Sequence, residues 1–117
     1  MDIVYRLQGV EFEWDSNKAQ SNIEKHGVTF EEATEVFFDH FYQTSDANPI
    51  NASSRELRAF IIGYSLEQRL LLVVHVERGL RTRIISARVA THTERKLFQS
   101  EAEILNIIQE IRSQTNC

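Results

Sequence analysis

The 117-residue sequence predicts one α+β domain, with two N-terminal helices and one long C-terminal helix packed on a mainly antiparallel β-sheet. Apolar and acidic residues alternate over Val10–Trp14, and strand-like runs recur between residues 41 and 88. Helix-start signals flank the second set of runs, because Thr-x-x-Glu capping boxes begin at Thr29 and Thr91. Residues 1–117 are therefore expected to form one domain, with 99–117 as a helical extension.

The N-terminal elements are predicted from turn and capping residues. Residues 4–14 indicate two short strands broken at Gln8-Gly9. Asp15 or Ser16 then caps a helix to about His26, which Gly27 ends in a left-handed conformation. The helix that starts after Thr29 carries one apolar stripe, made of Phe30, Ala33, Val36 and Phe37.

The remaining strands are predicted at residues 41–45, 57–65, 70–76 and 81–88. The third is apolar on both faces and is expected at the centre of the sheet. Residues 77–80 turn the chain back, so the fourth strand is antiparallel to the third. The last helix is expected to run from Thr91 to about Arg112.

Charge is unevenly distributed. The net charge is −4, but residues 1–54 carry 3 Lys/Arg against 10 Asp/Glu, and residues 55–96 carry 9 against 4. The basic stretch is mostly arginine, whose forked guanidinium suits phosphate, although arginine also occurs on solvated strand faces. Neither a signal peptide nor a membrane-length apolar run is present, and the one cysteine is Cys117, so we expect a cytoplasmic protein without membrane contact.

Several catalytic classes lack their motifs. The sequence contains no Gly-x-Ser-x-Gly, no phosphate-binding glycine loop and no His-Glu-x-x-His. Its four histidines lack metal-ligand spacing, and no metal or cofactor is expected.

Residues 73–95 bring together the side chains that suit phosphate chemistry. His75 lies near the end of one predicted strand, and the next strand and the start of the last helix supply Arg81, Arg83, Arg88, Thr91 and Arg95. These groups are expected to converge at one end of the sheet. Arg81 and Arg83 share a face, and Arg88 falls on the other unless the strand bends. If the turn between the two strands contains four residues, His75 and Arg83 point to opposite faces of the sheet. A one-residue bulge would place them on the same face.

Such a cluster suits RNA cleavage by transesterification without a metal. A base takes the 2′-hydroxyl proton, arginine stabilises the phosphorane, and an acid protonates the 5′-oxygen. His75 or His26 could supply the base or acid, because imidazole titrates near neutral pH. Lys25 and His26 also fit a second interpretation, in which they only complement the negative end of the first helix dipole.

Two blocks, FEWDSNKAQSNIEKHGVTFEEA at residues 12–33 and RIISARVATHTER at residues 83–95, resemble the BrnT family of bacterial toxins. The similarity covers about residues 3–99. It implies a RelE-like fold and a ribonuclease toxin of a type II toxin-antitoxin system that slows translation. It also implies a BrnA-like ribbon-helix-helix antitoxin as partner, which alone contacts operator DNA. Carried over by position, the Lys25-His26-Gly27 corner and the strand Arg83…Ser86-Ala87-Arg88 match family motifs. Together with the cluster at residues 73–95, this gives Lys25, His26, His75, Arg83 and Arg88 as expected catalytic residues, and Arg81, Thr91, Arg95 and Phe98 as expected RNA-binding residues.

Two departures from the family pattern keep an alternative open. Phe98 stands where members often have tyrosine, so its ring can stack but offers no hydroxyl. The chain also continues beyond the usual end, with an apolar stripe that could pack on its own sheet, form a homodimer or meet the antitoxin in a 2:2 complex. The alternative function is a catalytically weak homologue that binds the antitoxin and acts as a co-repressor.

Overall fold

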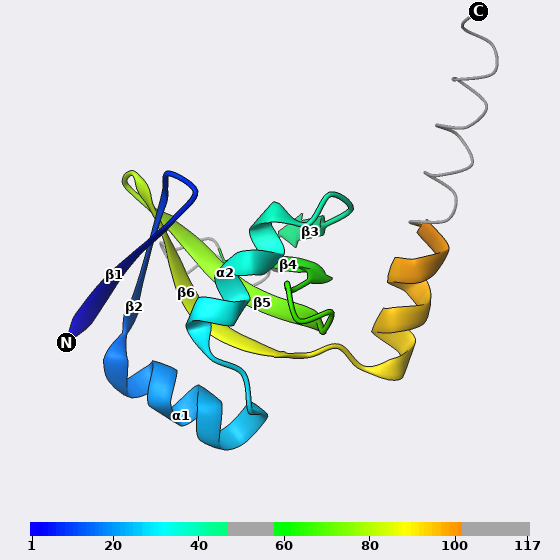
Figure 1. Ribbon diagram of the computed structural model, residues 1–117, viewed down its shortest axis with the longest axis horizontal. Helices are drawn as coiled ribbons and strands as arrows, with labels where there is room; N and C mark the ends of the chain where they lie inside the picture. The colour runs from blue at the N-terminus through cyan, green and yellow to red at the C-terminus, as the bar shows by residue number, and fades with distance from the viewer. Residues whose placement is uncertain (47–57, 102–117) are drawn as a thin grey trace, which may run out of the picture.

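The computed structural model describes residues 1–46 and 58–101 (Figure 1). Six strands of this part of the chain form one sheet in the order β1-β2-β6-β5-β4-β3. All neighbouring pairs are antiparallel except β2 and β6, which run parallel. The fold is therefore α+β with a mixed, mainly antiparallel sheet. The inner position predicted for the strand at residues 70–76 is confirmed, because β5 lies between β6 and β4.

The N-terminal hairpin and first helix form for the reasons read from the sequence. β1 (Asp2–Leu7) and β2 (Val10–Asp15) are joined by Gln8 and Gly9, which both have positive φ as a tight hairpin turn requires. α1 (Ser16–His26) begins after Asp15, whose carboxylate accepts a hydrogen bond from the Lys18 backbone N–H at 3.0 Å. Gly27 ends α1 with φ 66°, in the left-handed region.

The second helix is shorter than its apolar stripe. α2 (Phe30–Glu35) passes into a 3₁₀ turn, η1 (Val36–Phe38). The Thr29 hydroxyl accepts from the Glu32 N–H at 3.0 Å, as the capping box predicts. The Glu32 carboxylate, however, binds Ser65 and Arg69, so it does not complete the box.

The remaining strands are β3 (Gln43–Asp46), β4 (Arg58–Tyr64), β5 (Leu70–Arg78) and β6 (Arg81–Val89). The turn between β5 and β6 contains two residues rather than four, because Arg78 pairs with Arg81. Val76 therefore pairs with Arg83, and not with Arg81 as a four-residue turn would require.

A β-bulge in β6 decides which side chains share a face. His75 pairs with Ile84 and Val74 pairs with Ser86, which leaves Ile85 as the extra residue. Ile84 and Ala87 both enter the helix-covered core, so their respective neighbours Arg83 and Arg88 point to the opposite face. The bulge thus places Arg88 on the same face of the sheet as Arg81 and Arg83.

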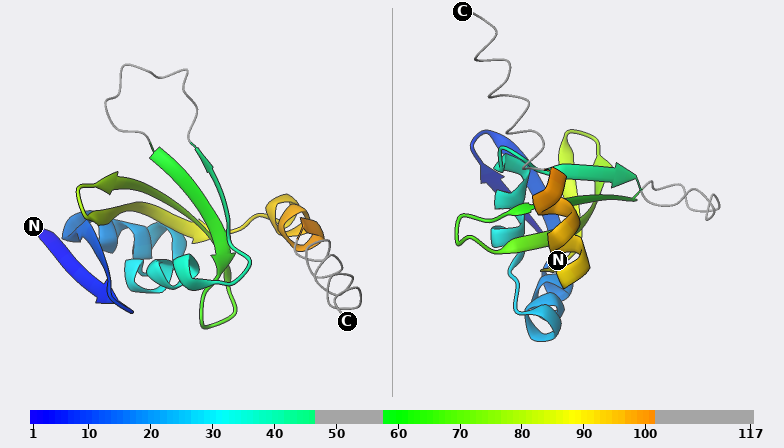
Figure 2. Two further views of the ribbon diagram at one scale, coloured as in Figure 1. Left: turned by 90° about the horizontal axis from the view of Figure 1, so that it is seen from above. Right: turned by 90° about the vertical axis from the view of Figure 1, so that its right-hand side faces the viewer.

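The core lies between the sheet and the two N-terminal helices, which cover one face (Figure 2). Trp14 packs edge-on against Phe30, with ring centroids 5.8 Å apart, and Phe12 packs against Phe37 at 5.2 Å. The buried members of this core are Phe12, Trp14, Val28, Phe30, Ala33, Val36, Ile61, Leu71, Val73, Ile84 and Ala87. Burial of the stripe Phe30, Ala33 and Val36 agrees with the sequence pattern.

The last helix is described over residues 92–101 and lies at the end of the molecule away from the N-terminus (Figures 1 and 2). Its predicted capping box is complete, because Glu94 N–H donates to the Thr91 hydroxyl at 3.2 Å and Thr91 N–H donates to the Glu94 carboxylate at 2.8 Å. The predicted continuation to Arg112 and most of the 99–117 extension lie outside the described residues. None of the helices in residues 1–46 and 58–101 is long and apolar enough to cross a bilayer.

Candidate functional site

A cleft of about 170 Å³ opens between α1 and β6, beside the bulge. Two lysines and a histidine line it, together with hydroxyl, amide and apolar groups: Lys18, Ser21, Asn22, Lys25, His26, Ile85 and Ser86. β6 pairs with β2 only through Thr82 and Arg83, and β2 ends at Asp15, where the chain turns into α1. The bulged part of β6 therefore faces α1 instead of a neighbouring strand.

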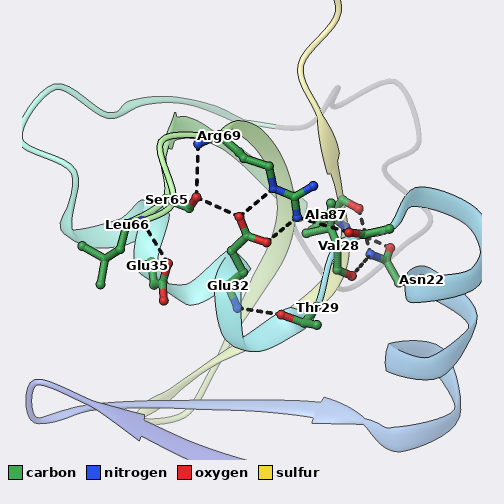
Figure 3. Close-up of polar contacts among 10 residues, drawn as sticks. Asn22, Val28, Thr29, Glu32, Glu35, Ser65, Leu66, Arg69 and Ala87 are labelled. Atoms are coloured by element: carbon green, nitrogen blue, oxygen red, sulfur yellow. Dashed lines mark hydrogen bonds and ion pairs between the residues drawn. The ribbon is translucent and has the colours of Figure 1, made fainter.

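Asn22 connects the two walls of this cleft. Its side chain is 5% exposed, and its Nδ2 donates to the Val28 carbonyl at 2.9 Å and to the Ala87 carbonyl at 2.8 Å. The Ala87 N–H donates back to Asn22 Oδ1 at 3.1 Å (Figure 3). One side-chain amide thus serves the open edge of β6 as a neighbouring peptide group would, and it ties β6 to the corner that follows α1.

A second polar network supports the same corner. The Arg69 guanidinium donates to the Gly27 carbonyl at 3.1 Å and, through Nε, to the Glu32 carboxylate at 2.9 Å (Figure 3). Ser65 donates to the same carboxylate at 2.8 Å. Arg69 holds the pKa of Glu32 below its usual range, although burial opposes the shift. The chain segment that carries Lys25 and His26 is therefore anchored from the β4–β5 loop as well as from α1.

The cations of the cleft differ from the three strand arginines, Arg81, Arg83 and Arg88, in their partners. Within residues 1–46 and 58–101, neither Lys18, Lys25 nor His26 forms an ion pair or a side-chain hydrogen bond. All three side chains are exposed. They leave their charge available to an anion.

The three predicted strand arginines share the opposite face, but each binds carboxylates. Arg81 Nε lies 3.0 Å from Glu11. The Arg83 side chain is 13% exposed and bridges Glu13 at 2.6 Å and Asp2 at 3.1 Å. These interactions, Asp2 first, raise the pKa of Arg83. Arg81 and Arg83 therefore join β6 to the N-terminal hairpin.

Arg88 forms a bidentate ion pair with Glu94, in which Nη1 lies 2.8 Å from Oε1 and Nη2 lies 2.9 Å from Oε2. Arg88 and the Thr91 N–H lower the pKa of Glu94 to about 2, against the effect of burial. Because Glu94 also caps the last helix, Arg88 joins the end of the sheet to the start of that helix. Thr91 serves as the N-cap in the same arrangement.

His75 does not meet the arginines. Its ring is 7% exposed and packs edge-on against Phe37 with centroids 4.9 Å apart, on the helix-covered face. Both ring nitrogens are buried without a hydrogen-bond partner in the described chain, and the Glu77 carboxylate lies 3.7 Å from Nδ1. Burial lowers the pKa of His75, with Glu77 opposing. The bulge expected to reunite His75 with Arg83 occurs further along β6 and leaves them on opposite faces.

The last helix carries two of the predicted RNA-binding residues, Phe98 and Arg95. Phe98 is 2% exposed and packs edge-on against Tyr64 at 5.7 Å, so its ring offers no free face for a base. Arg95 is half-buried, and its side chain forms no ion pair with the residues described.

The cleft also contains residues that the sequence reasoning missed. Lys18, Asn22 and Ser86 were not expected there, and helical spacing offered a signal for the first two. Lys18, Asn22 and Lys25 are four and three residues apart, which places them along one side of a helix. Ser86 lies within the second sequence block, but its place beside α1 depends on the bulge.

Comparison with known proteins decides the family. Residues 14–94 match the family model described as "Ribonuclease toxin, BrnT, of type II toxin-antitoxin system". The chain belongs to the BrnT family. The matched region contains α1, the cleft and all of β6, so the resemblance seen in the two sequence blocks is confirmed.

A solved BrnT structure has a similar fold. The chain resembles the Brucella abortus ribonuclease toxin BrnT with 23% identity and a TM-score of 0.52, over 68% of this chain and 94% of the other. At this identity the likeness concerns the fold. No protein of curated function matches the chain. Membership of this BrnT family implies an antitoxin partner.

The chemistry available in the cleft is anion binding and proton transfer. Two ammonium groups, one imidazole and two hydroxyls line a volume below the about 300–1,000 Å³ typical of small-molecule pockets. Among residues 1–46 and 58–101, no group of three His, Cys, Asp or Glu side chains gathers to hold a metal ion.

Proposed function

We propose that this BrnT protein is an endoribonuclease toxin that cleaves RNA by transesterification in the α1–β6 cleft. The observation that carries the proposal is the set of cations in one cleft, Lys18, Lys25 and His26, that bind no carboxylate in the described chain. Phosphate attraction dominates RNA affinity, so available cations matter more than the net charge.

The proposed chemistry assigns proton transfer to His26 and charge neutralisation to Lys25. His26 takes the 2′-hydroxyl proton while the 2′-oxygen bonds to phosphorus and the bond to the 5′-oxygen breaks. The imidazolium then donates that proton to the leaving 5′-oxygen. Lys25 neutralises the charge that develops on the phosphorane. The products are a 2′,3′-cyclic phosphate and a 5′-hydroxyl, and no metal takes part.

The strand arginines and His75 have a different place in this proposal. Arg83 and Arg88 would have to exchange carboxylates for phosphate before they could act on RNA. An Arg83→Ala variant is therefore a poor test of catalysis, because it leaves the buried carboxylate of Glu13 without its ion-pair partner and so destabilises the fold. His75 would need to leave the core to reach RNA, so we favour His26 as the residue that transfers protons.

The test is cleavage of mixed-sequence RNA in EDTA by purified protein freed from its antitoxin. We expect fragments ending in cyclic phosphate from the wild type and at least a 100-fold lower rate from His26→Ala, the lower end of about 10²–10⁴ for general acid–base groups. His92→Ala is the matched control, since His92 is exposed on the last helix outside the cleft. A 2′-O-methyl substrate should remain intact. Equal cleavage by wild type and His26→Ala, or fragments from the 2′-O-methyl RNA, contradicts the mechanism.

The wider role follows from the family. We propose that a BrnA-like ribbon-helix-helix antitoxin neutralises the protein in the cytoplasm and alone contacts operator DNA, with a homodimer or a 2:2 complex as the assemblies to distinguish. Growth arrest on expression, relieved by the neighbouring gene product, supports this role. Co-purification followed by mass measurement of the complex tests the stoichiometry.

A second candidate function is an antitoxin-binding module with weak catalysis. The observation that favours it is the carboxylate pairing of Arg81, Arg83 and Arg88, together with the buried Phe98 ring. Harmless expression, intact RNA and retained antitoxin binding would support this candidate over the first.

A further inference from the structure

We propose that Lys18 forms a second phosphate-binding position, so that the cleft holds a single RNA strand running along α1 and contacts two of its phosphates. This inference rests on the proposed function for the position of the scissile phosphate at Lys25 and His26. It adds the path of the strand along α1 and a minimum substrate of two phosphates.

The spacing of the two lysines sets the geometry. Lys18 and Lys25 line the same cleft from one helix, seven residues apart. A rise of 1.5 Å per residue separates them by about 10 Å along the helix axis. Neighbouring phosphates of a single strand are separated by a whole sugar-phosphate unit, so a distance of about 10 Å places the two lysines at different phosphates. One phosphate cannot contact both ammonium groups without drawing them together.

The position of Lys18 on α1 argues for a ligand. Lys18 lies in the first turn, where the helix dipole disfavours a cation, whereas Lys25 and His26 lie in the last turn, where it favours them. The first turn contains no acidic residue, and the carboxylate of the N-cap Asp15 lies 3.5 Å from the Met1 amino group. The dipole and Lys18 therefore add positive potential at that end of the cleft.

The walls of the cleft favour a single strand. The volume of about 170 Å³ admits a sugar-phosphate segment but not a duplex. The Ser21 and Ser86 hydroxyls lie on opposite walls, on α1 and β6, and both can donate to phosphate oxygens. Asn22 holds these walls at a constant separation through its bonds to Ala87.

The test uses fluorescent 2′-O-methyl RNA of two and ten nucleotides, which binds but cannot be cleaved, titrated at several salt concentrations. For the ten-mer, Lys18→Ala should reduce the slope of log affinity against log salt by about 0.7 to 1, and Lys18→Arg should restore it. For the dinucleotide, which has one phosphate, Lys18→Ala should change nothing, whereas Lys25→Ala should weaken binding of both. With cleavable ten-mer RNA, Lys18→Ala should raise KM at unchanged kcat.

Lys96→Ala is the control, because Lys96 is exposed outside the cleft, and thermal unfolding verifies that each variant is folded. A wild-type salt slope for Lys18→Ala on the ten-mer overturns the inference, as does an equal effect on the dinucleotide. These outcomes are separate from those of the proposed function. If the protein binds RNA with the predicted dependence on Lys18 but does not cleave it, the proposed nuclease activity is wrong and the phosphate-binding position is supported. If the protein cleaves RNA and Lys18→Ala has no effect on binding, the nuclease activity is supported and the phosphate-binding position is wrong.

Discussion

Replacing Asn22 with aspartate should destabilise the protein in a way that depends on pH. The variant keeps an acceptor for the Ala87 N–H, but it has no donor for the Val28 and Ala87 carbonyls, which now receive bonds at 2.9 and 2.8 Å. Each buried carbonyl left unpaired costs about 1–3 kcal/mol, so we expect a total loss of about 4 kcal/mol at neutral pH. For a chain of this size that loss lowers Tm by roughly 12–20 °C.

The pH dependence identifies the cause. Two facing carbonyl oxygens disfavour a carboxylate, so the folded-state pKa of the new carboxyl should rise above its unfolded value of about 3.9. The loss of unfolding free energy relative to wild type then reaches its full value at pH values above the folded-state pKa. It should shrink by up to about 1.4 kcal/mol per pH unit as pH falls through that pKa toward 3.9, because the protonated acid can donate to one carbonyl.

The assay is thermal and urea unfolding of wild type and variant from pH 8 to pH 4.5. Asn17→Asp is the matched control, since Asn17 is exposed in the first turn of α1. An anion at that position increases the free energy of unfolding by about 0.3–1 kcal/mol. A loss under 1 kcal/mol for Asn22→Asp, or one that stays constant with pH, would refute the argument that this amide joins the walls of the cleft.

Two further predictions concern other buried or paired groups. His75→Leu should stabilise the protein by about 1–2 kcal/mol at pH 7, because it removes two buried ring nitrogens that lack a hydrogen-bond partner among residues 1–46 and 58–101. Its advantage in urea unfolding should grow as pH falls below about 6.5, since the lowered folded pKa of His75 makes the wild type lose stability there; a constant advantage contradicts this. Glu94→Gln should cost about 1 kcal/mol at pH 7, after allowance for solvent screening of the half-exposed pair with Arg88. That cost should vanish as pH falls from 4.5 to about 2, the window between the ordinary and folded pKa of Glu94, and a cost that persists in acid unfolding would exclude the ion pair as its source.

Local signals in the sequence were sufficient for most of the fold. The Gln8-Gly9 turn, the Asp15 cap and the Gly27 stop each depend on a residue and its immediate neighbours, and all three occur as predicted. The capping box at Thr91 also forms completely. The box at Thr29 does not, because Arg69, distant in sequence, competes for Glu32.

The candidate site was harder to predict because it depends on the register between β5 and β6. The composition identified the right residue types, but a two-residue turn and the extra Ile85 decided their faces. The charge pattern also could not reveal that acidic side chains from the N-terminal hairpin bind Arg81 and Arg83, since that requires β2 to lie beside β6. Only the Lys25–His26 corner was both expected and found in the cleft.

The extra residue at Ile85 has a consequence for comparing and engineering these proteins. Ile84 and Ala87 are three residues apart, so without the bulge the alternation of a regular strand would turn Ala87 outward and Arg88 inward, and would remove the partner that Glu94 needs at the start of the last helix. Deleting Ile85 would leave both side chains on their present faces, because Ile84 and Ala87 would then be two residues apart. The faces of Ala87 and Arg88 thus depend on the bulge together with the number of residues that precede them. A sequence alignment with a one-residue gap at Ile85 would therefore still match side chains on the same faces, and grafting this strand into another scaffold would require either room for the bulge or removal of Ile85.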